Sequence, residues 1–94
     1  IIMFVVSVNI DEKHAHILYK LWRNTCFGKG HMLPENLLTG FPKNEKKEYK
    51  EALNELIKRG IVCIKPTVKG NAYYINLQFR EQVKHALLEY YDFL

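Results

Sequence analysis

The sequence has few of the residues on which metal, disulfide and enzyme sites are commonly built. It contains two cysteines, Cys26 and Cys63, which do not form a C-x-x-C pair. We expect two buried, reduced thiols, since no spacing supports either a zinc site or a disulfide. The sequence also lacks a phosphate-cradling glycine loop and a nucleophile motif. We therefore expect a protein that is not an enzyme and that needs neither cofactor nor metal.

The histidines do not suggest a metal site either. His14 and His16 are two positions apart, so on a helix they point in different directions and cannot share a metal ion. His31 and His85 have no partner nearby in the sequence. We expect each histidine to have a core or surface role.

Long apolar runs are also missing. The run at positions 1–8, IIMFVVSV, has about eight residues, whereas a membrane span needs about twenty. It lacks the basic start and the small-residue cleavage site of a signal peptide. We therefore expect a cytoplasmic protein with no membrane partner. Residues 1–9 are expected to form an apolar strand or extended arm, packed either on a neighbouring subunit or on its own domain.

The overall composition is that of a small globular protein. The chain has 94 residues, of which 48% are hydrophobic and 26% are charged. This length is enough for one domain that holds together without metal or disulfide staples. The net charge of +4 and the pI near 9.1 permit a polyanionic partner but do not require one.

The first predicted helix runs over 10–27. Asn9 and Glu12 have the spacing of a capping box at its start, and Gly28 follows its end. Trp22 is expected to anchor the core from this helix. The face opposite the core is expected to carry Lys13, His16, Lys20 and Arg23.

A helix-turn-helix arrangement is predicted next. Residues 31–33 are expected to be a short extended piece, and Pro34 suits the first turn of a helix of about six residues. Gly40 is expected to close that helix, and Pro42 to open the next one. A short helix, a tight turn with glycine and a longer helix form the helix-turn-helix motif.

The longer helix, 43–59, has segregated charges. Its apolar stripe is made of Tyr49, Leu53, Leu56 and Ile57. At about 100° per residue, one flank of the stripe carries Lys43, Lys46, Lys47, Lys50 and Lys58. The other flank carries Glu45, Glu48, Glu51 and Glu55. Seventeen residues with ten charges can segregate by chance, so the pattern gains weight only from the helix-turn-helix spacing and the basic hairpin that accompany it.

A β-hairpin and a last helix complete the chain. The runs 61–65 and 72–77 are predicted to be strands joined by a turn at Gly70-Asn71. Gly60 stands where a left-handed residue ends a helix. Helical spacing then predicts a last helix over 78–93, with an apolar surface that extends beyond its main stripe.

The order helix, short strand, short helix, long helix, hairpin and helix resembles the winged helix-turn-helix superfamily, an α+β fold. The most specific stretch is LNELIKRGIVCIKPTVKGNAYYINL, and the resemblance covers residues 10–77. In particular, it resembles the small stand-alone transcription regulators common in archaea and bacteria. The chain is thus expected to be one winged-helix domain over 1–94, with residues 78–94 as an appended helix.

The resemblance implies that the long helix enters the major groove and that the hairpin wing touches the DNA backbone or minor groove. The implied DNA contacts on the long helix are Lys43, Asn44, Lys46, Lys47, Lys50 and Asn54. Those on the wing are Lys65, Lys69 and Asn71. Lysines supply affinity rather than sequence choice, whereas the two helix asparagines can pair with adenine edges. Arginine, which makes the commonest guanine contact, is absent from this flank, and the four glutamates would oppose phosphate.

A dimeric transcriptional regulator that binds double-stranded DNA is the leading prediction. The expected homodimer contacts are Phe4, Val6, Leu87, Leu88, Tyr91 and Phe93, although these residues can also simply pack in their own chain. One alternative is a winged-helix module that binds a protein within a larger complex. Another is RNA binding, with Tyr73 and Tyr74 stacking on unpaired bases or, alternatively, packing in the hairpin. Nothing in the sequence indicates a small-molecule ligand.

Overall fold

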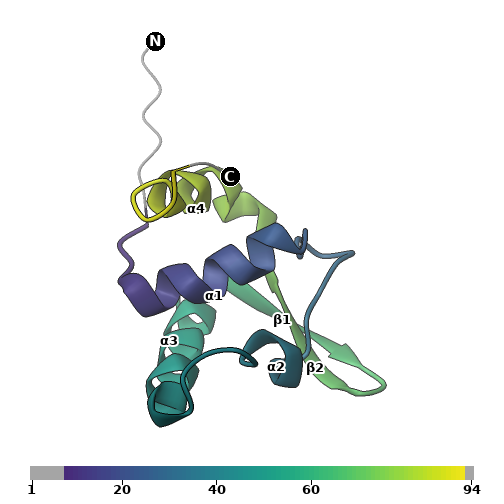
Figure 1. The fold of residues 1–94 in the computed structure, drawn as a ribbon. Coiled ribbons are helices and arrows are strands. Elements are labelled where there is room, and N and C mark those ends of the chain that lie inside the picture. Colours follow the sequence, from purple (N-terminus) through teal and green to yellow (C-terminus); the bar gives the residue numbers. More distant parts are fainter. Residues whose placement is uncertain (1–7, 93–94) are drawn as a thin grey trace.

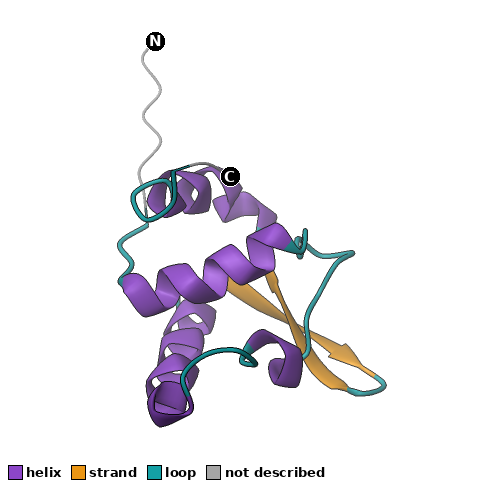
Figure 2. Ribbon diagram, in the orientation of Figure 1, coloured by secondary structure: helices purple, strands orange, loops and turns teal. Residues whose placement is uncertain are grey.

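The computed structural model describes residues 8–92, and they form an α+β fold (Figure 1). Four α-helices and a two-stranded antiparallel hairpin make up its regular structure, as Figure 2 shows. The elements are α1 (Glu12–Arg23), α2 (Pro34–Leu37), the 3₁₀ turn η1 (Lys43–Glu45), α3 (Lys46–Lys58), β1 (Val62–Thr67), β2 (Gly70–Ile75), the 3₁₀ turn η2 (Leu77–Phe79) and α4 (Arg80–Leu87). The α+β class and the order of the elements are confirmed. Phe4, Val6 and Phe93 lie outside the described residues.

The first helix is shorter than predicted at both ends. Asp11, not Asn9, caps α1: its Oδ1 accepts a hydrogen bond from the His14 N–H at 3.0 Å, and His14 Nδ1 accepts from the Asp11 N–H at 3.1 Å. This reciprocal pair is a capping box in which histidine replaces the expected glutamate. The helix ends at Arg23 because Thr25 has φ 52°, which turns the chain out of the helical path.

The helix-turn-helix segment follows the prediction, with a shorter first helix. Pro34 is the first residue of α2, which has only four residues, and Gly40 lies in the turn that follows. The long helix spans the predicted range, but its first turn, η1, is 3₁₀ rather than α. Pro42 precedes that turn instead of opening it. After α3, Gly60 has φ 75°, the left-handed conformation expected there.

The hairpin forms as predicted, but its turn lies two residues earlier in the chain. Val68 and Lys69 connect the strands, and Gly70, with φ 120°, already pairs with Thr67. Only glycine adopts this φ readily, so Gly70 can end the turn and still form the first residue pair of the hairpin. Met32 pairs with Tyr73 through two backbone hydrogen bonds of 2.8 and 2.9 Å. This bridge confirms the short extended piece at 31–33 and places it beside β2.

The core is centred on α1, which packs against α3, α4 and β2 (Figure 1). Its inward residues are fully buried: Ala15, Ile17, Leu18 and Leu21. They meet Leu37 of α2, Leu56 of α3, Ile75 of β2 and Val83 of α4 in one apolar cluster. Trp22 lies at the edge of this cluster and packs edge-to-face on Phe27 at 5.2 Å. The predicted anchor is therefore a boundary residue rather than a central one.

The last helix, α4, is much shorter than the predicted 78–93. The backbone leaves the helix after Leu87, and the Tyr90 hydroxyl donates to the Ile10 carbonyl at 3.1 Å. Leu87 is fully buried in the core of its own chain. For Leu87, the structure thus shows the packing in its own chain that the sequence left open beside a dimer contact. Leu88, in contrast, is 44% exposed, so part of its side chain remains accessible.

Candidate nucleic-acid interface

The lysines predicted to face DNA lie together on the outer side of α3 and its first turn. All six predicted residues of this helix have exposed side chains: Lys43, Asn44, Lys46, Lys47, Lys50 and Asn54. Within the described residues none of the lysines comes within 4.0 Å of a carboxylate oxygen, since the ion pairs found there involve other residues. We call Lys43, Lys46, Lys47 and Lys50 the α3 lysine cluster. Its charges are free to meet an external anion.

The acidic flank of α3 is turned toward α1. Lys13 Nζ lies 3.4 Å from Glu45 Oε1, and the bond to Glu45 is the main cause that raises the pKa of Lys13. Glu55 Oε2 lies 2.7 Å from Nε2 of His14, whose side chain is only 7% exposed. Two of the four glutamates that would oppose phosphate thus have cationic or donor partners inside the molecule. Glu48 and Glu51 remain exposed.

His14 connects α1 to α3, the helix that carries the lysine cluster. Its Nδ1 accepts from the Asp11 N–H, so in the neutral ring the proton sits on Nε2 and is donated to Glu55. The ring therefore ties the start of α1 to the acidic flank of α3 across 41 positions of sequence. The buried stripe of Tyr49, Leu53 and Leu56 sets the rotation of α3, and this contact joins the acidic flank of the helix to α1.

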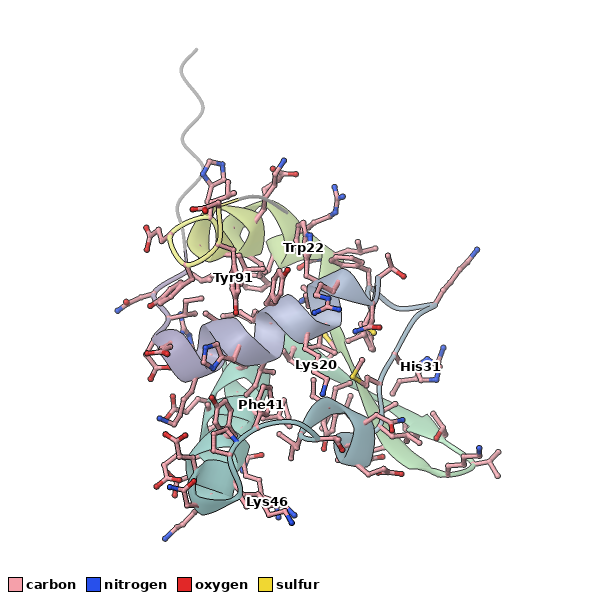
Figure 3. The ribbon with its side chains drawn as sticks, viewed as in Figure 1. Lys20, Trp22, His31, Phe41, Lys46 and Tyr91 are labelled. Atoms are coloured by element: carbon pink, nitrogen blue, oxygen red, sulfur yellow. The ribbon has the colours of Figure 1, made fainter. Side chains whose placement is uncertain are left out.

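A groove runs beside the cluster, between α2 and the start of α3. Its volume is about 570 Å³, and its walls include Lys43, Lys46 and Lys50 together with Leu38 and Phe41. Figure 3 shows Lys46 at the lower end of α3, away from α1. The groove has one carboxylate in its lining, Glu35, against three lysines. A polyanion lying along α3 would meet a surplus of positive charge here.

The hairpin carries the second predicted group. Lys65, Lys69 and Asn71 are all exposed, and Lys65 Nζ donates to the Gly28 carbonyl at 3.4 Å. The start of α3 and the tip of the hairpin project toward the same edge of the view in Figure 1, with α2 between them. The backbone segments that carry the helix group and the wing group thus lie on either side of α2 in this view.

Two further polar residues lie in this region and were not among the predicted contacts. His31 and Asn36 line a hollow of about 400 Å³ with Thr67, Val68 and Lys69 of the hairpin. Both are exposed. They are more than 30 positions away from the hairpin tip, so their spacing in the sequence did not predict that they lie near it. The pairing of Met32 with Tyr73 brings them beside the hairpin.

The tyrosines proposed for stacking on unpaired bases are engaged elsewhere. Tyr73 and Tyr74 are half-buried and pack against the core. Tyr74 pairs with Cys63 across the hairpin, and the Cys63 thiol is the main cause that raises the pKa of the Tyr74 hydroxyl. This packing is the alternative that the sequence left open, and it leaves the lysines as the principal polar groups of the surface.

The arginines are occupied away from this surface. Arg59 Nη1 donates to the Asn9 carbonyl at 2.6 Å, and Arg80 lies over the rings of Trp22 and Phe27. Arg23 lies over the ring of Tyr19. No group of three or more histidine, cysteine or acidic side chains that could hold a metal ion occurs in residues 8–92. None of the helices in this part of the chain has the length and apolar character needed to cross a membrane.

Comparison of the chain with protein-family models, with curated protein sequences and with solved structures yields no match. Function is therefore inferred from the geometry of the surface.

Proposed function

We propose that the protein is a winged-helix DNA-binding protein that acts as a transcriptional regulator. The observation that carries this proposal is the division of charge on η1 and α3: the α3 lysine cluster faces outward with no carboxylate partner among residues 8–92, while Glu45 and Glu55 contact α1. A second observation supports the winged-helix comparison. The chain runs from α1 through the Met32 bridge, α2, α3 and the hairpin to α4, which is the order typical of that fold.

In the proposed complex, α3 lies in the major groove and its lysines contact phosphates on both sides. The wing residues Lys65, Lys69 and Asn71 contact the flanking backbone. Asn44 and Asn54 are the candidates for base contacts, because an asparagine can pair with an adenine edge through two hydrogen bonds. No arginine lies on this surface, so we expect salt-sensitive binding with modest sequence selectivity. Part of that selectivity would come from DNA shape.

We also propose that the regulator is a homodimer. Leu88 is 44% exposed and follows α4 directly. Tyr91 is only half-buried, although one face of its ring stacks on Tyr19. A symmetric dimer would present two α3 helices to successive major grooves, about 34 Å apart.

The test is a binding titration with fluorescent double-stranded DNA of random sequence at low salt, read by anisotropy. We expect binding at micromolar protein or tighter, and competition by unlabelled duplex DNA. Single-stranded RNA of equal length serves as the second competitor. Failure to bind duplex DNA would reject the proposal and favour the protein-interaction alternative, while stronger competition by RNA would favour the RNA-binding one.

A further inference from the structure

A second groove lies on the outer face of α1, separate from the α3 lysine cluster. Its volume is about 630 Å³. Its walls come from α1, the turn at Gly40–Pro42, Glu45 and Tyr49 of η1 and α3, and Tyr91 after α4. In Figure 3, Tyr91 lies on one side of α1 and Phe41 on the other, and Lys20 projects from α1 toward the Phe41 side. These segments are distant in the sequence, so the groove exists only in the folded chain.

Aromatic rings form both walls of this groove. Tyr19 stacks on Tyr91 with ring centroids 3.8 Å apart, and Phe41 stacks on Tyr49 at 4.2 Å. His16 adds a third ring beside the second pair, and its Nδ1 lies 2.7 Å from the Tyr49 hydroxyl. Tyr19, Phe41 and Tyr91 are half-buried, so each keeps part of its ring surface exposed. Ring edges and faces of this kind suit a planar apolar group.

The groove also has a surplus of positive charge. Its lining holds three cations, Lys13, Lys20 and Arg23, and two carboxylates, so its net charge is +1 with His16 neutral. Glu45 pairs with Lys13 at 3.4 Å, and Glu12 lies 3.6 Å from His16 Nε2. Lys20 and Arg23 have no such partner among the residues described. Burial, and then the neighbouring charge of Arg23, lower the pKa of Lys20. An anion placed between these two cations would offset their mutual repulsion.

We propose that this groove binds a small aromatic carboxylate, with its ring against Tyr91 and Phe41 and its carboxylate on Arg23 and Lys20. Arg23 lies over the Tyr19 ring at 5.8 Å and Lys20 over the Phe41 ring at 5.4 Å, so both cations are held at the aromatic walls. Small-molecule sites commonly have volumes of about 300–1,000 Å³, aromatic walls and a few charged groups that fix orientation. A surplus of one positive charge in the lining suits one carboxylate better than a phosphate chain.

The position of the groove suggests a consequence for DNA binding. The turn at Gly40–Pro42, which forms part of the wall, leads directly into η1 and α3. The Lys20 ammonium donates to the carbonyl of Thr39 in the same turn. A bound carboxylate would compete for Lys20 and alter this contact. This consequence depends on the proposed DNA-binding function, whereas ligand binding itself does not.

The test uses 2-naphthoate and two analogues, titrated into the protein without DNA. The analogue 2-naphthamide keeps the rings and removes the charge, and decahydronaphthalene-2-carboxylate keeps the charge and removes the aromatic character. We expect 2-naphthoate to bind at least about tenfold more tightly than either analogue, because each lacks one of the two recognition elements. The binding constants come from calorimetry, and the site comes from backbone amide shifts, expected around Tyr19, Phe41 and Tyr91.

Two matched variants test whether the Arg23 guanidinium binds the carboxylate. Arg23→Gln should weaken 2-naphthoate binding about tenfold and leave 2-naphthamide binding unchanged, since only the acid uses the guanidinium. Arg80→Gln removes the same charge from an exposed arginine that packs on Trp22 and Phe27 outside the groove, and it should have no effect. The proposal is overturned if 2-naphthoate does not bind at 10 mM, if the acid and the amide bind equally, or if the amide shifts fall elsewhere. Because no DNA is present, these outcomes are independent of the proposed regulator function.

Discussion

Replacing Lys46, Lys47 and Lys50 with alanine tests the α3 lysine cluster directly. All three side chains are exposed and lack carboxylate partners among the described residues, so their removal should leave the core intact. Each lysine that neutralises one phosphate contributes about 0.9 to the slope of log K against log salt. The triple variant should therefore reduce the magnitude of this slope by about 2.7. Between 50 and 200 mM salt, that difference amounts to about a 40-fold smaller loss of affinity.

The assay is fluorescence anisotropy of a labelled duplex at four or more salt concentrations. The control is a second triple variant, Lys29, Lys58 and Lys84 to alanine, in which all three lysines are also exposed. Both variants lower the net charge from +4 to +1, because each removes three positive charges. Lys58 lies about 18 Å from Lys46 along the helix axis. An unchanged slope for the first triple would remove α3 from the interface, and equal reductions in both would show that only net charge matters.

Three further predictions concern stability and thiol chemistry. His14→Ala should lower the free energy of unfolding, measured by urea titration, by about 2–3 kcal/mol, because it removes a buried ring that bonds to Glu55 and to the cap of α1. Glu55→Gln keeps an acceptor for His14 and should lower the free energy of unfolding by less than half as much. Gly60→Ala should lower the free energy of unfolding by about 1 kcal/mol and the melting temperature by about 4–8 °C, because φ is 75° at this position. An added Cβ would meet no described atom within 4 Å, so the loss would come from backbone conformation and not from a clash, and an unchanged melting temperature would refute this explanation. Burial raises the pKa of the Cys26 thiol, so at pH 8 Cys26 should react with a thiol reagent more slowly than the half-buried Cys63. Mass spectrometry of the labelled peptides would measure the two rates, and a faster reaction at Cys26 would contradict its burial.

The ends of the helices were the least predictable part of the fold. The spacing of apolar residues is local, and it located α1, α3 and the hairpin correctly. The sequence predicted Asn9 as the cap of α1, whereas Asp11 is the cap because it exchanges reciprocal hydrogen bonds with His14. At the other end of the chain, helical spacing continued past Leu87, but the structure turns there. A periodic pattern does not by itself mark where tertiary contacts replace helical ones.

The candidate interface was predictable in its residues but not in its electrostatics. A period of 3.6 residues places the lysines and the glutamates of α3 on different flanks, whatever the rest of the chain does. Whether the glutamates oppose a polyanion depends on what faces them. Lys13 and His14, more than 30 positions earlier, face Glu45 and Glu55 only because α1 packs against α3. The partners of a charge are set by packing, which spacing along the chain does not specify.

The sequence by itself determined the α+β class, the helix-turn-helix spacing and the outward position of the lysines on α3, because each depends on local conformation and helical period. Only the tertiary structure decided that Leu87 belongs to the core, that His31 lies beside the hairpin, and that Tyr19, Phe41 and Tyr91 line one groove. Those relations join segments that are distant in the chain. They arise when the apolar stripes of α1, α3 and α4 and the buried side chains of β2 pack together, since this packing sets which outer surfaces become neighbours.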